Sequence, residues 1–413
     1  MNVNNLCKSV KDASNAFVAV STEEKNRILN AIKSKIEQNE DKIIEINAID
    51  LDVASKSGLN SAFLDRLKLT KSRIKTMCDG IVDIINLPDY VGKIEEKYTL
   101  KNGLEVEKVH APLGVIGIIY ESRPNVTVDA AVLCIKSGNG VVLKGGKESI
   151  NSNRYLVSLM KEAFAECGYN SNLIGFIDSV DRAKTAEMLQ CSQYIDVVIP
   201  RGGEKLKHYV LATATMPVIA SSGGNCHIFV EKSADFDMAN KVIENAKMSR
   251  PSVCNALETL LVQEEIAQEF LPICLENLKS KGVEIRGKQE IKDIFDDTIL
   301  IEDDEFFTEY GELKIKVKIV KDIEEAINHI NHYSTNHSEA ILTSNNALAD
   351  VFAKNVDSAC VYVNASTRFT DGFELGLGAE MGISTQKLHV RGPIGLKELT
   401  SVKFVVRGNG QVR

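Results

Sequence analysis

The chain has 413 residues, of which 44% are hydrophobic and 26% are charged, a composition typical of a globular protein. It excludes a disordered chain, a collagen-like fibre and a small disulfide-stapled scaffold, and a prior of about 150 residues per domain indicates two or three domains. The net charge of −8 argues against nucleic acid as a main partner, because a protein that binds the phosphate backbone normally presents a basic face.

Cysteine usage and the N-terminal segment indicate the compartment. The nine cysteines are scattered without a CxxC pair, which predicts free thiols in a reducing environment rather than a zinc site or a secreted disulfide framework. The first seventeen residues lack the apolar core of a signal peptide, and the apolar run at 113–120 is too short to cross a bilayer. We therefore expect a cytoplasmic protein without membrane contact.

The N-terminal region is expected to be helical and to lead into a hairpin. Within residues 23–86, Ile28, Ile32 and Ile36 recur at helical spacing with charged residues between them. The stretch 98–110 centres on Asn102-Gly103, and an Asn-Gly pair between alternating segments is a strong hairpin signal.

Short apolar runs then alternate with helical segments, which predicts parallel strands joined by crossover helices and buried on both faces. The first half has the pattern of a doubly wound nucleotide-binding sheet, with runs at 113–119, 141–144, 173–177, 195–199 and 217–220. A second α/β half follows, with runs at 227–230, 257–262, 316–320 and 359–364, a helix at 323–330 and a last apolar run at 402–406. The predicted fold class is therefore α/β.

Neither common nucleotide-binding fingerprint is present. Gly138-Asn139-Gly140 precedes a strand and lacks a third glycine, whereas the dinucleotide fingerprint needs a strand before it and a helix after it. The stretch 145–149 lacks the upstream glycine and the Ser/Thr directly after lysine that a P-loop requires. A nucleotide bound by this half must use another geometry.

Cys254 is the most informative single residue. It lies between a turn at Pro251 and an apolar strand, and backbone N–H groups can stabilise a partly exposed loop thiol as a reactive thiolate. A buried inert cysteine is the more common alternative, and spacing alone leaves both open. His329, His332 and His337 fall within nine residues, but no carboxylate or cysteine set completes a metal site, so helix packing is the favoured interpretation and no metal is predicted.

The segment 320–341, VKDIEEAINHINHYSTNHSEAI, resembles the signature of the γ-glutamyl phosphate reductases, also called glutamate-5-semialdehyde dehydrogenases. The matching positions are Val320, Ala326, His329, Ile330, Tyr333, Ser334, Thr335, His337, Ser338, Glu339 and Ile341. Further stretches that resemble this family lie at 111–131, 133–148, 196–203, 224–230 and around Cys254, so the likeness extends over nearly the whole chain.

The family belongs to the aldehyde dehydrogenase superfamily, and the resemblance implies its three-part subunit. A Rossmann-like dinucleotide-binding domain would comprise residues 1–97 and 112–225, an α/β catalytic domain residues 226–385, and a small oligomerisation flap residues 98–111 and 386–413. The superfamily binds its dinucleotide without the usual glycine fingerprint, which would account for the missing fingerprint here. A homo-oligomer is expected.

The resemblance implies reduction of L-glutamyl 5-phosphate by NADPH to L-glutamate 5-semialdehyde and phosphate, the second step of proline biosynthesis from glutamate. Cys254 matches the superfamily nucleophile, whose thiolate would form a thioester that then accepts hydride. The backbone N–H of Cys254 is one candidate oxyanion donor. Asn125 is the nearest match to the side-chain amide that supplies the second donor, with a turn or helix-cap role as its alternative.

The resemblance also assigns the cofactor contacts. Lys144 matches the lysine that contacts the adenosine ribose, and Lys147 stands where many NAD-preferring relatives carry glutamate. An ammonium pairs well with a 2′-phosphate, so NADPH is expected over NADH, although a solvated surface lysine is the alternative. Glu309 aligns with a glutamate that holds the nicotinamide ribose, and Gly202 and Gly203 match the loop that approaches the cofactor. The alternative for Glu309 is an ordinary acidic loop, and the alternative for Gly202 and Gly203 is a simple crossover turn.

The substrate carries a carboxylate and a phosphate, which arginine binds bidentately. Arg123, Arg250 and Arg368 are the candidates, each with a surface ion pair as the alternative. Where hydrolytic aldehyde dehydrogenases carry a water-activating glutamate, in a glutamate-leucine-glycine-glycine stretch, this chain has Ser221-Ser222-Gly223-Gly224. Loss of that base is compatible with a reductase, which must not hydrolyse its acyl-enzyme.

Two other functions stay open at this point. One is an aldehyde-oxidising member of the superfamily, which would act without phosphate. The other is a catalytically inactive relative with a binding or structural role, against which the retained Cys254 motif argues. Glutamate 5-kinase, which makes the labile acyl phosphate, is an expected pathway neighbour and a candidate transient partner.

Overall fold

The computed structural model describes residues 2–221 and 223–413. The chain divides into two compact units. The first comprises Met1–Ser221, Leu377–Gly382 and Ile394–Arg413, and the second comprises Ser222–Gly376 and Ile383–Pro393.

The first unit opens with helices, as the periodicity of the sequence predicts. They are α1 (Val3–Phe17), α2 (Thr22–Gln38), α3 (Glu40–Lys56), α4 (Ser61–Leu67) and α5 (Lys71–Asn86). Asn2, Ser21, Asn60 and Thr70 cap α1, α2, α4 and α5 by accepting a hydrogen bond from a first-turn backbone N–H. The predicted apolar stripe of α2 is fully buried.

A four-stranded parallel sheet follows, in the order β5-β4-β3-β6. Its strands are β3 (Val115–Tyr120), β4 (Gly140–Lys144), β5 (Ile174–Phe176) and β6 (Val197–Arg201). The crossover segments contain α6 (Pro124–Lys136), η1 (Lys147–Ser149), α7 (Ile150–Glu166), η2 (Ser171–Leu173) and α8 (Arg182–Leu189), and α9 (Glu204–Thr213) follows β6. The strand order reverses beside β3, where the chain passes from one edge of the sheet to the other. This is the strand order of one nucleotide-binding half of a doubly wound fold.

One predicted strand is wrong. The apolar run 217–220 makes only an isolated parallel bridge, between Val218 and Val198. The run lies beside β6, at the edge of the sheet. Its backbone forms hydrogen bonds with the outer side of β6, and the chain then leaves the first unit.

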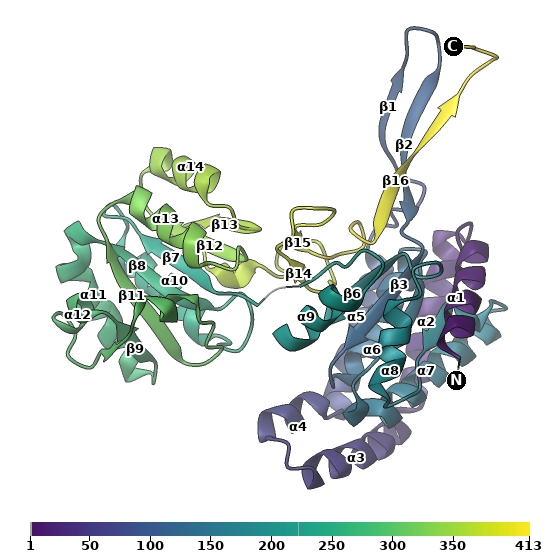
Figure 1. The fold of residues 1–413 in the computed structure, drawn as a ribbon, viewed down its shortest axis with the longest axis horizontal. Helices are drawn as coiled ribbons and strands as arrows, with labels where there is room; N and C mark the ends of the chain where they lie inside the picture. Colours follow the sequence, from purple (N-terminus) through teal and green to yellow (C-terminus); the bar gives the residue numbers. More distant parts are fainter. Residues whose placement is uncertain (1, 222) are drawn as a thin grey trace. The chain divides into compact units, whose positions relative to one another are not determined.

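The Asn-Gly hairpin is confirmed, and it belongs to a three-stranded antiparallel sheet. Strands β1 (Ile94–Thr99) and β2 (Glu105–Pro112) form the hairpin, and β16 (Thr400–Arg407) pairs along β2. Gly103 has φ 83°, a left-handed conformation that glycine adopts without strain. The sheet extends away from the helices of its unit as a separate arm (Figure 1).

The second unit is built on a seven-stranded parallel sheet in the order β10-β9-β11-β8-β7-β12-β13. Its strands are β7 (Cys226–Val230), β8 (Leu257–Gln263), β9 (Glu284–Gly287), β10 (Ile299–Leu300), β11 (Lys314–Val320), β12 (Ser338–Leu342) and β13 (Cys360–Val363). The remaining elements are α10 (Phe236–Met248), α11 (Glu264–Ser280), α12 (Gln289–Lys292), η3 (Asp303–Phe307), α13 (Ile323–Tyr333), α14 (Asn346–Asn355), η4 (Thr367–Phe369), β14 (Ile383–Ser384) and β15 (Gly392–Pro393).

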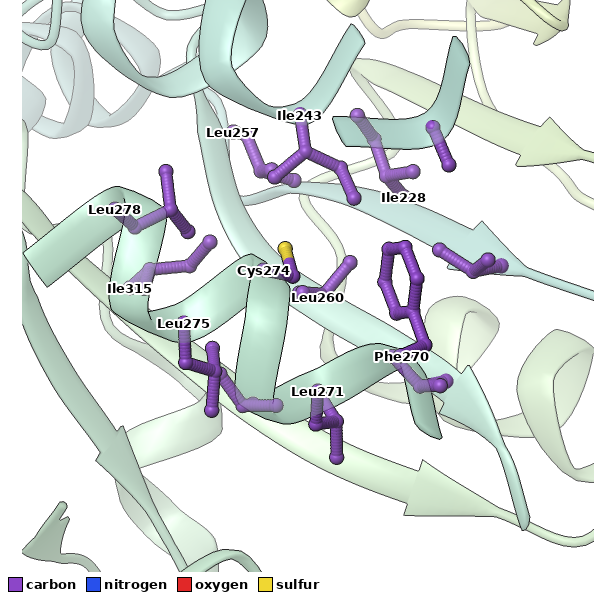
Figure 2. Packing of buried hydrophobic residues seen from close by; sticks show 14 of the residues in the cluster. Ile228, Ile243, Leu257, Leu260, Phe270, Leu271, Cys274, Leu275, Leu278 and Ile315 are labelled. Atoms are coloured by element: carbon purple, nitrogen blue, oxygen red, sulfur yellow. The ribbon is translucent and has the colours of Figure 1, made fainter. Parts of the chain in front are cut away.

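Helices cover both faces of this sheet because its strands are apolar on both sides. Ile228 and Leu260 face α10 and α11 in the larger cluster, which Figure 2 shows around Phe270. Phe229 and Leu261, one residue further along the same strands, pack against α13 and α14 in a second cluster. Successive residues of a strand point to opposite faces, so continuous aliphatic runs require cover on both sides. No helix of the described residues is both long and apolar enough to cross a membrane.

Leu260 lies fully buried in the larger cluster, so we expect Leu260→Ala to lower the free energy of unfolding by about 2–5 kcal/mol, through lost burial and the cavity left behind. Urea unfolding at one pH measures this difference. Ile273→Ala is the matched control, since Ile273 is exposed on α11, and a loss of similar size in both variants would contradict the assignment of the core.

Candidate functional site

Cys254 lies in the turn between α10 and β8, directly before the strand begins. It is partly exposed, and the backbone N–H of Ala256 closes the turn on the carbonyl of Val253 at 3.0 Å. The turn therefore presents the thiol at the amino end of a buried parallel strand, as the sequence predicts for a loop cysteine.

The backbone of the neighbouring segment before β7 fits tightly against this turn. A Cβ on Gly224 would overlap the carbonyl oxygen of Cys254, so only glycine is compatible with this approach. The thiol of Cys226, the first residue of β7, donates to the same carbonyl at 3.1 Å. These contacts fix the Cys254 backbone from the side of β7.

Two of the predicted arginines lie near Cys254. The guanidinium of Arg368 donates to Oδ1 of Asn255 and, at 3.0 Å, to Oγ of Ser249. Burial lowers the pKa of Arg368, and the positive charge of Arg250 lowers it further, while the charges of Asp371, Cys254 and Glu374 oppose the shift. Two neighbouring cations beside a thiol form a place where an anionic ligand would be stabilised.

Glu309 lies in the loop between η3 and β11, at the same edge of the sheet. The side chain is exposed, and its carboxylate packs on the Cα of Gly223, where a Cβ would overlap it. The backbone N–H of the next residue, Tyr310, donates to Oε2 of Glu258 at 2.9 Å. The structure thus brings Glu309, Cys254, Arg250 and Arg368 together within the second unit.

The signature segment forms the end of β11, helix α13 and strand β12, and four of its polar side chains (His329, His337, Ser338 and Glu339) are buried. His329 packs edge-on against His227 and Phe306, with ring centroids 5.5 and 5.0 Å apart. Burial lowers the pKa of His329 to about 2 and that of His337 to about 4, so both are neutral at pH 7. The ring of His332 packs against Phe307 in a tilted arrangement, with centroids 5.3 Å apart. Across residues 2–221 and 223–413, no group of three or more metal-ligating side chains is placed to hold a metal ion.

Glu339 is the buried centre of this segment. Its carboxylate accepts from the backbone N–H of His227 at 2.6 Å, from Oγ of Ser358 at 3.3 Å and from Oγ of Ser334. Burial raises the pKa of Glu339 to about 8 against these hydrogen bonds. Sequence reasoning matched Glu339 to the signature but gave it no role, because its partners come from β7 and from the loop after α14.

A cavity of about 560 Å³ lies in the first unit, at the carboxyl ends of β3 and β4. Its lining residues are Phe63, Ile119, Tyr120, Glu121, Ser122, Lys144, Gly145, Gly146, Lys147, Glu148, Val180, Arg182, Thr185, Lys205, Leu206 and Tyr209. The carboxyl ends of parallel strands next to a reversal of strand order are the usual ligand site of a doubly wound sheet. The volume is that of a small-molecule or cofactor pocket.

Cations outnumber acids in the lining. Lys144 is buried, its Nζ donates to the carbonyl of Gly145 at 3.0 Å, and burial lowers its pKa. Lys147 begins η1 and is exposed. Sequence reasoning missed Arg182 and Lys205, which lie in the first turns of α8 and α9. A search for basic residues in the first turn of each helix that follows a predicted parallel strand would have identified both.

Gly202 and Gly203 lie beside this cavity, but they are not among the described residues that line it. An added Cβ on Gly202 would lie 2.7 Å from the side chains of Glu121 and Leu206, both of which line the cavity. Gly203 is the N-cap residue of α9. The two glycines therefore allow the crossover to pack closely beside the pocket.

The remaining predicted residues lie on the first unit. Asn125 is exposed in the first turn of α6, and its Nδ2 donates to Asp129 one turn later at 2.9 Å. Burial raises the pKa of Asp129 to about 6. Arg123 is the N-cap residue of α6 and is exposed. Ser222, in the stretch that replaces the hydrolytic glutamate motif, lies outside the described residues.

We expect Glu339→Gln to flatten the pH dependence of stability between pH 5 and 8. The folded pKa of Glu339 is raised to about 8, so in this range the folded state holds a proton that the unfolded state has lost. The stabilisation is complete below pH 4.5 and is lost as the pH rises towards 8, with a slope of up to about 1.4 kcal/mol per pH unit. Urea unfolding of both proteins at several pH values measures the slopes, and parallel curves would contradict a protonated Glu339.

Comparison with known proteins agrees with this geometry. Residues 1–290 match the aldehyde dehydrogenase family. The gamma-glutamyl phosphate reductase of Caldicellulosiruptor bescii is 50% identical over 410 residues, covering 98% of both chains, and that of Clostridium perfringens (strain SM101) is 48% identical over 406 residues, covering 98% of both chains.

The crystal structure of gamma-glutamyl phosphate reductase from Thermotoga maritima aligns with a TM-score of 0.98 at 45% identity and covers 100% of both chains. A propionaldehyde dehydrogenase from Clostridium phytofermentans, 17% identical with a TM-score of 0.69 and covering 98% of this chain and 97% of its own, shares the fold. The predicted aldehyde dehydrogenase-like α/β fold is therefore confirmed. The chain belongs to the aldehyde dehydrogenase family and, within it, to the gamma-glutamyl phosphate reductases.

Proposed function

We propose that the protein catalyses the NADPH-dependent reduction of L-glutamyl 5-phosphate to L-glutamate 5-semialdehyde and phosphate, the second step of proline biosynthesis from glutamate. The observation that carries this proposal is the partly exposed Cys254, held in a turn with Arg250 and Arg368 beside it. A thiol next to two cations suits a substrate whose reacting carbon bears a phosphate leaving group and whose other end bears a carboxylate.

In the first half of the reaction, the Cys254 thiolate attacks the acyl carbon. A sulfur–carbon bond forms, the carbon–oxygen bond to phosphate breaks, and phosphate leaves with the electron pair. The arginines would bind the substrate's anionic groups, and the backbone N–H of Cys254 would donate to the oxyanion. Asn125 is proposed as a second donor, through the N–H of Nδ2 that it does not give to Asp129.

The second half reduces the thioester to the aldehyde and returns the thiolate. When bound, NADPH supplies the hydride for this step. The cavity of the first unit fits NADPH, because its lining has more cationic than acidic side chains. The cations are Lys144, Lys147, Arg182 and Lys205, and the acids are Glu121 and Glu148. Lys144 would contact the adenosine ribose, and Glu309, exposed beside Gly223, would hold the nicotinamide ribose.

The chain lacks the glutamate with which hydrolytic relatives activate water against the thioester. Ser221-Ser222-Gly223-Gly224 occupies the corresponding stretch. Gly224 packs on the carbonyl of Cys254, and Gly223 packs on Glu309, so in this chain the pair of glycines serves close packing. An acyl-enzyme without a positioned general base survives until it is reduced.

We further propose the three-part division of the subunit, with the dinucleotide-binding domain at 1–97 and 112–225, the catalytic domain at 226–385 and the flap at 98–111 and 386–413. The antiparallel arm of β1, β2 and β16 supports a separate flap. Tyr98, Val402, Phe404 and Val406 are exposed on this arm, and such an apolar surface supports a homo-oligomer. Transient contact with glutamate 5-kinase and a cytoplasmic location complete the proposal.

The deciding experiment is a coupled assay with glutamate, ATP, a glutamate kinase and NADPH. We expect the intact chain to oxidise NADPH only when all components are present, and Cys254→Ala to lose turnover by at least about 1,000-fold, because no other group can form the thioester. Cys274→Ala, which alters a buried core thiol, is the control and should retain turnover. Turnover that survives Cys254→Ala would reject the mechanism.

The reverse reaction separates this function from that of a hydrolytic aldehyde dehydrogenase. Oxidation of glutamate semialdehyde with NADP⁺ should require inorganic phosphate, because phosphate is the acyl acceptor. Oxidation at the same rate without phosphate would favour the aldehyde-oxidising alternative.

For cofactor preference, we expect Lys147→Glu to move the ratio of kcat/KM for NADPH over NADH towards NADH by roughly 10-fold or more. The substitution replaces a cation that pairs with the 2′-phosphate by an acceptor for ribose hydroxyls. Lys8→Glu on α1, also exposed but outside the cavity, makes the same charge change as a control. An intact protein that already prefers NADH would contradict the assignment.

A further inference from the structure

We propose that Lys316 is a positioning residue that holds the segments 223–225 and 308–310 in a fixed position relative to each other, beside the Cys254 turn. This proposal rests on the function proposed above, and it concerns a side chain that touches neither the thiol nor any group assigned to the reaction. All of its contacts lie within the second unit.

Lys316 is a fully buried ammonium in the middle of β11. Its Nζ donates to Oδ1 of Asn225 at 2.8 Å, to the carbonyl of Thr308 and, at 3.4 Å, to the carbonyl of Phe306. It also lies 5.0 Å from the ring centroid of Tyr310. Within the described part of the chain no carboxylate forms an ion pair with it. Burial lowers its pKa to about 8. An ammonium kept in such a place is destabilising unless its hydrogen bonds are well made.

The first segment reaches the nucleophile through Asn225. Its backbone N–H donates to Oγ1 of Thr335 at 3.0 Å, and its Nδ2 donates to the carbonyls of Phe306 and Tyr333 at 2.7 and 2.8 Å. The amide oxygen is left to accept from Lys316. Because Gly224 immediately precedes this anchored residue and packs on the Cys254 carbonyl, the position of Asn225 sets that of the turn.

The second segment reaches the same turn from the other side. The N–H of Tyr310 donates to Oε2 of Glu258 at 2.9 Å, and Oε1 of Glu258 accepts from Lys247 at 3.0 Å. Lys247 also donates to the carbonyl of Leu257 at 2.8 Å. Lys247 and Glu258 precede and follow the Cys254 turn in the chain, and both are fully buried. The contacts therefore close a ring in which Lys316 is the link between the two segments.

The consequence concerns the reaction step that depends on Glu309. Both chain neighbours of Glu309 are held: Thr308 accepts from Lys316, and Tyr310 donates to Glu258. The Glu309 carboxylate itself packs on Gly223. Without the Lys316 ammonium, the carbonyl of Thr308 and the amide oxygen of Asn225 lose their shared donor. The hydrogen bond from Asn225 to the carbonyl of Phe306 remains, so Glu309 gains freedom to move relative to the turn but is not released from it. A shift of about 1 Å at reacting groups can lower a rate about 100-fold without removing any reacting group.

The test compares Lys316→Met with Lys314→Met. Lys314 is two residues earlier on the same face of β11, where it forms an ion pair with Glu312 at 2.8 Å. The assay is phosphate-dependent oxidation of L-glutamate 5-semialdehyde by NADP⁺, with the aldehyde carrying hydrogen or deuterium at the transferred position. We expect Lys316→Met to lower kcat roughly 10- to 100-fold, to change KM for phosphate less than about 3-fold and to increase the deuterium isotope effect on kcat. Lys314→Met should match the intact protein in all three.

A second readout does not depend on turnover. The rate at which iodoacetamide alkylates Cys254, followed by peptide mass spectrometry, should rise at least about 3-fold in Lys316→Met, because a loosened turn exposes its thiol more often. If the intact protein shows no phosphate-dependent turnover, the proposed function fails, while this measurement still decides the positioning role. A folded Lys316→Met whose kcat, isotope effect and alkylation rate equal those of Lys314→Met overturns the proposal.

Thr335→Val covers the case in which Lys316→Met does not fold. This nearly isosteric change removes only the acceptor of the Asn225 N–H and leaves Lys316 in place. We expect the same pattern at smaller size, with kcat lowered about 3- to 10-fold, a larger isotope effect and faster alkylation of Cys254. Unchanged values of all three in folded Thr335→Val would also overturn the proposal.

Discussion

The close approach of Gly224 to the carbonyl of Cys254 is the contact on which the rest of the catalytic unit depends. It joins the segments that lead into β7 and β8, adjacent parallel strands of one sheet, and it leaves no room for a side chain. The thiol of Cys226 closes on the same oxygen. Cys254 is thus held through its backbone carbonyl, so its position depends on the contacts that fix the neighbouring segment.

What fixes that segment is a set of polar and charged groups buried at the amino ends of the strands. Lys316, Glu258 and Lys247 are all fully buried, as are the neutral histidines and Glu339 of the signature segment. Buried polar groups are destabilising unless their hydrogen bonds are satisfied, so such a network tolerates only one arrangement of its loops. In the signature segment, His329 and His332 pack against aromatic rings, and His337 contacts Oγ of Ser338 at 2.8 Å.

The two parallel sheets place their functional groups at opposite ends. In the four-stranded sheet, the cavity lies at the carboxyl ends of the strands beside a reversal of strand order, as is usual for doubly wound folds. In the seven-stranded sheet, Cys254 precedes β8, the Gly224 segment precedes β7, and Glu309 precedes β11, all at amino ends. A carboxyl-end rule applied to both halves would have found the cavity of the first unit and missed Cys254.

The sequence by itself determined the α/β class, the N-terminal helices, the Asn-Gly hairpin and most strands, because these follow from local periodicity and turn chemistry. Resemblance to the family added Cys254 and Lys147 as predictions, because they lie in contiguous stretches that match, and the charge of the substrate added the arginines. The tertiary structure alone decided that 217–220 makes a single bridge, that Arg182 and Lys205 enter the pocket, and that Lys316 joins Asn225 to Thr308. These contacts join residues far apart in sequence, and the burial that makes Lys316 or Glu339 informative exists only once the strands are assembled.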